Sequence, residues 1–147
     1  AAMQGVHCTS DGLYVVARLG EQRAAEGAYV WKSLIETGAV VTNGTDAPVG
    51  DVSPIASYYA TVSRRLADGS VFFPEQRLSR LEAVKTYTIN AAFAAFEEDI
   101  KGSLTVGKLA DITVLSKDVM TIPEDEISST EVAYTIVGGR IMYSRTN

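Results

Sequence analysis

The sequence contains one cysteine, Cys8, and one histidine, His7. A single cysteine excludes a disulfide within the chain and any cysteine-based zinc site, so a reducing compartment, the cytoplasm, is expected. A catalytic zinc ion usually takes three protein ligands, most of them imidazole or thiolate groups. The carboxylates of Asp11, Asp46 and Asp51 follow no known calcium-loop spacing. We therefore expect the chain alone to bind no catalytic metal.

Clusters of basic residues and long apolar runs are also lacking. The net charge is −5 and the isoelectric point is near 4.8, a balance that repels phosphate backbones and anionic lipids. No nucleic-acid partner and no membrane partner are expected. The opening segment 1–6 has no basic start, unlike a signal peptide, and its strand-like composition suggests that the chain is a fragment of a longer protein. A hydrophobic content of 46% predicts one globular core.

Strand and helix signals alternate as far as about Gly102 and predict an α/β layer with parallel strands. At Ser53-Pro54 and at Ser79 the sequence carries helix-start signals, the second of them a capping box with Glu82. Strands are predicted over residues 2–6 and 39–42, and helical segments over 13–20, 28–35, 53 to about 67–69, 79–90 and 91–96.

Beyond Gly102 the pattern changes to that of an antiparallel sheet. A strand is predicted over 109–115 and a hairpin over 132–143, with Gly138-Gly139 at its turn. The two earlier strands cannot close a barrel or complete a sheet, so they need partner strands that this sequence does not contain.

Asp46 and His7 are the candidate site residues. Asp46 lies just beyond the buried strand 39–42, where active-site groups collect in parallel α/β folds, and a metal ligand would suit this position. An aspartate ahead of Pro48 is also a common turn residue. His7 holds the equivalent place after the first strand, either as a contact to substrate or metal or as a hydrogen-bonded structural side chain. Both groups are expected at the same face.

Taken in order, several segments resemble the C-terminal part of the amidohydrolase superfamily, in its amidohydrolase-3 or YtcJ-like branch related to N-substituted formamide deformylases. Gly5 stands where members commonly carry proline, and Thr45 where serine is common. The segments that carry the resemblance are Met3-Gln4-Gly5-Val6-His7 with Ser10-Asp11, Arg18-Leu19-Gly20 with Arg23, Ala28 to Leu34, Gly44-Thr45-Asp46-Ala47-Pro48-Val49, Glu82-Ala83, Tyr87 to Ala92, Gly102-Ser103-Leu104, Gly107 to Asp111, and Thr135 to Arg140.

This resemblance implies the C-terminal part of a (β/α)8 TIM barrel, with its last two strands and helices in residues 1–101, and a segment of a small composite β-sandwich in 102–147. It implies that Asp46 touches the metal and serves as base for the attacking water, and that His7 contacts the substrate. The remaining metal ligands have no counterparts in this sequence.

The resemblance further implies a metal-dependent hydrolase of a non-peptide C–N bond, in an amide, formamide or cyclic amide, with a divalent metal, zinc, in the full-length enzyme. The isolated chain is expected to be inactive. Its expected partners are the N-terminal part of the same protein, a small-molecule substrate and further copies in a homo-oligomer. The alternative is a non-catalytic regulatory or binding module that keeps the same scaffold.

Overall fold

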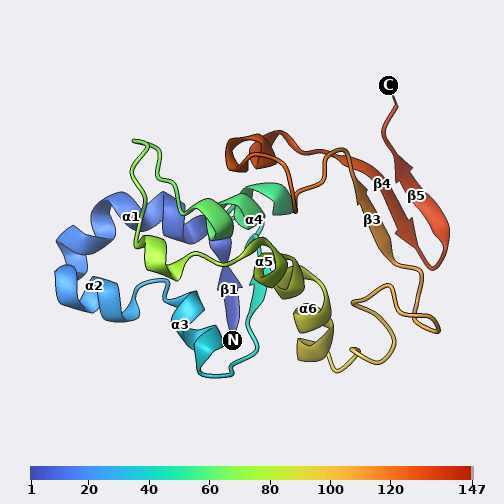
Figure 1. Ribbon diagram of the computed structural model, residues 1–147, viewed down its shortest axis with the longest axis horizontal. Helices are drawn as coiled ribbons and strands as arrows, with labels where there is room; N and C mark the ends of the chain where they lie inside the picture. Colours follow the sequence, from blue (N-terminus) through green and yellow to red (C-terminus); the bar gives the residue numbers. More distant parts are fainter. Residues whose placement is uncertain (147) are drawn as a thin grey trace.

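The computed structural model describes residues 1–146 and shows a helical part joined to a small antiparallel sheet (Figure 1). The described chain is mixed α/β. Its elements are β1 (Ala2–Gln4), α1 (Gly5–Leu19), α2 (Glu21–Gly27), α3 (Trp31–Glu36), β2 (Thr42–Gly44), α4 (Pro54–Ser63), the 3-10 helix η1 (Pro74–Gln76), α5 (Arg80–Tyr87), α6 (Ile89–Ala94), β3 (Ile112–Leu115), the 3-10 helix η2 (Glu124–Ser129), β4 (Val132–Val137) and β5 (Arg140–Ser144).

Strands β1 and β2 pair in parallel, as the alternation of strands and helices predicts. Ala2 lies opposite Thr42, and Gln4 lies opposite Gly44, so both strands end at the same edge. The prediction of a strand over 39–42 was wrong in its bounds, because β2 runs from Thr42 to Gly44. The predicted segment still lies alongside the first residues, since the Val40 carbonyl accepts a hydrogen bond from the Ala1 amino group at 2.7 Å.

Helix α1 begins at Gly5, directly after β1, so the predicted strand over 2–6 is too long and the helix predicted over 13–20 begins eight residues too late. Its buried positions Cys8, Gly12 and Val15 recur at helical spacing and face the core. At Gly5 an added Cβ would overlap the Ser57 carbonyl oxygen and come within 2.6 Å of Thr61 Oγ1. Glycine therefore lets α1 pack against α4 at backbone distance, and His7 lies in the first helical turn.

Helix α4 starts at the predicted Ser53-Pro54 signal but ends at Ser63, short of the predicted 67–69. The next residue, Arg64, adopts a left-handed φ of 49° and turns its fully buried side chain into the core. Its Nε donates to the Phe72 carbonyl at 2.6 Å and its Nη1 to the Tyr29 carbonyl at 3.0 Å. These hydrogen bonds end the helix, and no local sequence pattern predicts them.

The capping box at the start of α5 is confirmed, with both the Ser79 and the Glu82 side chains bonded to the other residue's backbone. Glu82 also pairs with Lys32 Nζ at 2.6 Å, which links α5 to α3. Helix α5 ends at Tyr87, Thr88 interrupts the helical path, and α6 runs from Ile89 to Ala94, two residues earlier than the predicted 91–96.

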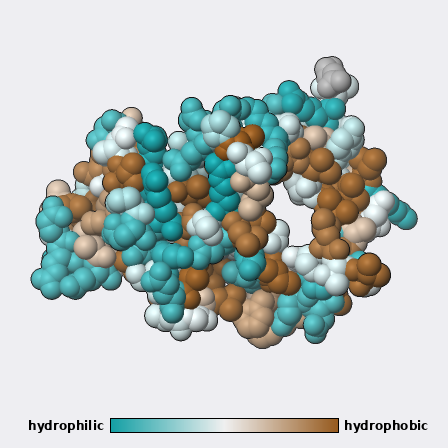
Figure 2. Space-filling view, viewed as in Figure 1, coloured by the Kyte–Doolittle hydropathy of each residue, from teal (hydrophilic) through white to brown (hydrophobic). Residues whose placement is uncertain are grey.

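Strands β3, β4 and β5 form an antiparallel sheet in that order, which confirms the predicted hairpin turn at Gly138-Gly139. Figure 2 shows an opening between the sheet and the helical part. It corresponds to a cavity of about 740 Å³ between α5, α6 and the sheet, with Val84, Ala91 and Ile136 in its lining.

The domain boundary at 101/102 stays a prediction. Among the described residues, no helix has the length and apolar character needed to cross a bilayer.

Candidate functional site

The parallel pairing of β1 and β2 brings the two predicted site residues together. His7 Nε2 lies 3.9 Å from Asp46 Oδ2. The His7 side chain is 26% exposed and that of Asp46 is 50% exposed, so both groups are open to solvent at the edge where the strands end. The expected proximity is therefore observed, while the roles of the two residues stay predictions.

The backbone of Asp46 forms a turn, and its side chain is half-exposed. Its φ is +56°, a left-handed conformation that aspartate tolerates better than most residues. Its carbonyl oxygen accepts hydrogen bonds from the Val49 amide at 2.7 Å and the Gly50 amide at 3.3 Å, which closes a turn. The backbone of Asp46 therefore makes the turn, while its side chain is the candidate site group. The two interpretations of this residue are compatible.

Asn43 and Ser57 hold the first turn of α1, which sequence reasoning missed. Asn43 Oδ1 accepts a hydrogen bond from the Gly5 amide at 2.8 Å, and Ser57 Oγ accepts one from the Val6 amide at 3.1 Å. In the sequence, Asn43 stands out only as the start of an Asn-Gly-Thr triplet, and nothing local indicates a partner 38 residues away. The bonds exist because β1 and β2 lie side by side.

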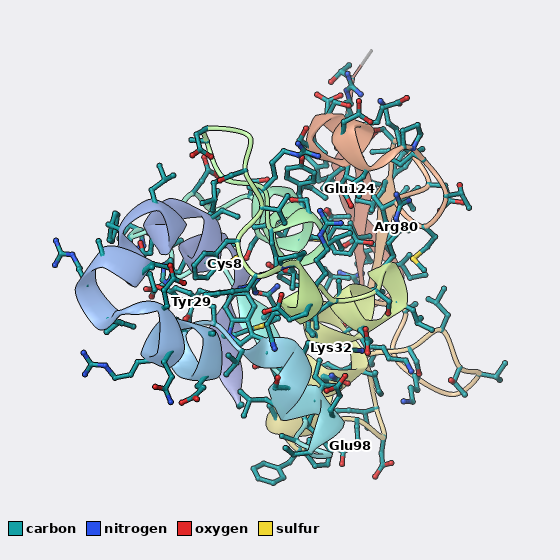
Figure 3. All side chains as sticks on the ribbon, turned by 60° about the vertical axis from the view of Figure 1, so that its left-hand side comes forward. Cys8, Tyr29, Lys32, Arg80, Glu98 and Glu124 are labelled. Atoms are coloured by element: carbon teal, nitrogen blue, oxygen red, sulfur yellow. The ribbon has the colours of Figure 1, made fainter. Side chains whose placement is uncertain are left out.

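The Asp11 carboxylate, one helical turn after His7 on α1, accepts hydrogen bonds from three hydroxyl groups. Ser10 Oγ donates at 2.9 Å, Tyr14 Oη at 2.7 Å, and the Tyr29 hydroxyl donates to the other carboxylate oxygen. These bonds, first among them the one from Tyr29, lower the pKa of Asp11. Burial and the bond to Asp11 raise the pKa of Tyr29. Figure 3 shows Tyr29 beside the α1 to α3 helices, near Cys8.

A Tyr29→Phe variant is expected to lose about 1 kcal/mol of folding free energy near neutral pH, because one bond to a charged carboxylate disappears. The pKa of Asp11 is lower in the folded state, so this contribution is present above the unfolded pKa and is lost as pH falls through the folded pKa. Urea unfolding between about pH 2 and 7 measures it. The exposed Tyr14→Phe variant is the control, with a smaller loss, and a pH-independent loss in Tyr29→Phe would contradict the assignment.

Cys8 is no candidate nucleophile. Its side chain is fully buried in α1 and points at the Ala60 carbonyl oxygen, 3.9 Å from Sγ. Burial raises the pKa of the thiol to about 11, which disfavours the reactive thiolate. Cys8 and its neighbour His7 both lie on helix α1.

Potential metal ligands are scarce in the part of the chain that the structure describes. Residues 1–146 contain no group of three or more histidine, cysteine, aspartate or glutamate side chains placed to bind one ion. Asp46, half-exposed beside His7, can offer a single carboxylate to a metal held mainly by other residues. The site geometry therefore fits one contributing ligand and not a complete metal centre.

A carboxylate and an imidazole thus lie beyond the carboxyl ends of two adjacent parallel strands, the edge at which α/β proteins commonly carry their active sites. The chain matches the model of the amidohydrolase family over residues 1–143. It belongs to the amidohydrolase family.

The chain is similar to curated proteins from several organisms. It is 30% identical to an N-substituted formamide deformylase of Arthrobacter pascens over 86% of this chain and 23% of that protein. It is 35% identical to the protein LONG AFTER FAR-RED 3 of Arabidopsis thaliana over 97% of this chain and 24% of that protein. The chain thus spans about a quarter of the length of these curated relatives.

The fold is also found in a solved structure. An uncharacterized metal-dependent hydrolase from Pyrococcus horikoshii superposes with a TM-score of 0.72 at 27% identity, covering 84% of this chain and 25% of that one. The arrangement of helices and strands described above is therefore that of an amidohydrolase-type protein.

Proposed function

We propose that this chain is the C-terminal part of a metal-dependent hydrolase that cleaves a non-peptide C–N bond, in an amide, formamide or cyclic amide. The observation that carries this proposal is the half-exposed Asp46 carboxylate at the end of a parallel strand, 3.9 Å from the single histidine of the sequence. Membership of the amidohydrolase family and the similarity to a formamide deformylase support it.

In this proposal β1 and β2 are the last two strands of a (β/α)8 barrel, and the remaining strands lie outside this chain. Support comes from the two-stranded parallel sheet, whose outer edges are unpaired among the described residues. Parallel sheets are normally buried inside larger α/β layers, so open edges call for further strands. The exposed β5, and the apolar cavity between the helices α5 and α6 and the strands β3 and β4, offer surface to the rest of the protein or to a second copy.

The proposed enzyme uses a divalent metal, zinc, to which Asp46 contributes one ligand while the others come from residues outside this chain. The similarity to a metal-dependent hydrolase supports a metal. When bound, such an ion supplies Lewis acidity that lowers the pKa of a coordinated water.

Asp46 acts in this proposal as the base that accepts a proton from the attacking water and delivers it to the departing nitrogen. Its partial exposure keeps the carboxylate reachable by a water molecule. His7, on the first turn of α1, contacts the substrate from the neighbouring strand end and offers a hydrogen bond to its polar atoms. Both groups approach from one face, which leaves the opposite side of the substrate to residues outside this chain.

The test compares the complete protein with the isolated chain on two probes, formanilide and N-butylformamide, by release of the amine. The complete protein is expected to turn over at least one probe, to lose turnover after dialysis against a chelator, and to recover it with zinc. The isolated chain with added zinc is expected to be inactive and to purify with little metal. Substantial turnover by the isolated chain, or chelator-resistant turnover by the complete protein, would overturn the proposal.

A further inference from the structure

The backbone donors at the start of α1 are held by residues distant in sequence. A helix usually satisfies its first free N–H groups with the side chain that immediately precedes it. Gln4 occupies that position in α1 and makes no such bond. The Gly5 amide donates instead to Asn43 Oδ1 at 2.8 Å, across to the neighbouring strand β2. The turn that carries His7 is therefore fastened to the strand that leads to Asp46.

The Asn43 amide group is fixed on both sides. Its Nδ2 donates to Thr61 Oγ1 at 3.1 Å, and its Oδ1 also accepts from Ser57 Oγ at 3.2 Å. Thr61 in turn donates to the Ser57 carbonyl at 2.6 Å, and the side chains of Thr61 and Ser57 are 0% and 1% exposed. The orientation of the Asn43 amide is thus determined by buried partners on α4.

The contact at Gly5 leaves α1 little freedom to move toward α4. An added Cβ there would overlap the Ser57 carbonyl oxygen, so the two backbones already touch. Movement away from α4 would break the bond from the Gly5 amide to Asn43. Close contact on one side and the hydrogen bond on the other together define the position of the first turn.

We propose that Asn43 is a positioning residue that sets the separation of His7 from Asp46. Asn43 lies on β2, three residues before Asp46, and its side chain holds the first turn of the helix that carries His7. Asn43 therefore connects the strand that leads to Asp46 with the helical turn that carries His7. This inference rests on the proposed function, in which these two groups act together on the substrate.

A matched comparison of two asparagines tests the inference. Asn90 Nδ2 donates to the Val41 carbonyl at 2.9 Å, so Asn90 also fastens the segment leading into β2, but at the opposite end of that strand from the first turn of α1. Asn43→Ala and Asn90→Ala are made in the complete protein, and kcat and KM are measured on formanilide and N-butylformamide. In the complete protein, the ring signals of His7, assigned by their loss in a His7→Gln variant, are compared by NMR at one pH.

Asn43→Ala is expected to lower kcat by about 10- to 100-fold with a much smaller change in KM, because a misplaced reacting group slows the chemical step. The same variant is expected to shift the His7 ring signals. Asn90→Ala is expected to lower the thermal midpoint without either effect. Equal shifts in the two variants, or an unchanged His7 signal in a folded Asn43→Ala variant, would overturn the inference.

Asn43→Asp provides a second reading if the alanine variant does not fold. Aspartate keeps the oxygen that accepts from the Gly5 amide but loses the donor to Thr61, so the first turn of α1 should remain attached and the His7 signals should stay near those of the unchanged chain. A displaced His7 signal in Asn43→Asp would overturn the inference. If the unchanged complete protein hydrolyses neither probe, the proposed function fails on these probes, while the NMR comparison still decides the role of Asn43.

Discussion

Replacing Asp46 with asparagine is expected to lower kcat of the complete protein by about 10²- to 10⁴-fold, the usual contribution of a general base, which is the role proposed for this residue. An amide has the shape of the carboxylate but cannot accept the proton of the attacking water. The Asp46 side chain is half-exposed, so the exchange should leave the fold intact. Steady-state kinetics on formanilide, with circular dichroism to confirm folding, measure the effect.

Asp51→Asn in the same loop is the matched control. The Asp51 carboxylate accepts a hydrogen bond from the Ser53 amide at 2.7 Å, and the asparagine side chain retains an oxygen for that bond. The control removes the same charge from the same loop and should change kcat less than about threefold. A similar loss of kcat in both variants would assign the effect of Asp46→Asn to the charge of the loop. Full activity of the Asp46→Asn variant would show that Asp46 takes no part in the reaction.

An Arg64→Ala variant is expected to lose about 3 to 5 kcal/mol of folding free energy. The buried guanidinium lies over the rings of Trp31 and Phe72, 5.5 and 5.3 Å from their centroids, and donates to the carbonyls of Phe72 and Tyr29. Alanine would leave those two carbonyls without these donors and open a cavity among the rings. Urea unfolding, followed by circular dichroism and by the fluorescence of the single tryptophan, reports the loss.

The neighbouring arginine supplies the comparison for Arg64. Arg65 is exposed, and its Nη1 makes one long bond of 3.4 Å to the Gly69 carbonyl. Arg65→Ala is therefore expected to cost less than about 0.5 kcal/mol. Equal stabilities of the two variants would show that the buried guanidinium contributes no more than a surface side chain and would contradict the role assigned to Arg64 in the core.

Part of the candidate site could be predicted from the sequence. Asp46 and His7 were identified because each follows a short strand-like segment, and parallel strands place their ends at one edge. Their observed proximity agrees with that reasoning. Asn43 could not be found in the same way, since its bond to the Gly5 amide joins residues 38 positions apart and requires the pairing of β1 with β2.

Local sequence determined the features whose causes lie within a few residues: the α5 capping box of Ser79 and Glu82, the Ser53-Pro54 start of α4, and the Gly138-Gly139 hairpin. Tertiary structure alone determined that α4 stops at Ser63 and that the first turn of α1 is held by Asn43 and Ser57. Backbone partners and buried donors from distant segments control these features, and their free energies exceed the small differences in local propensity that a sequence pattern reports.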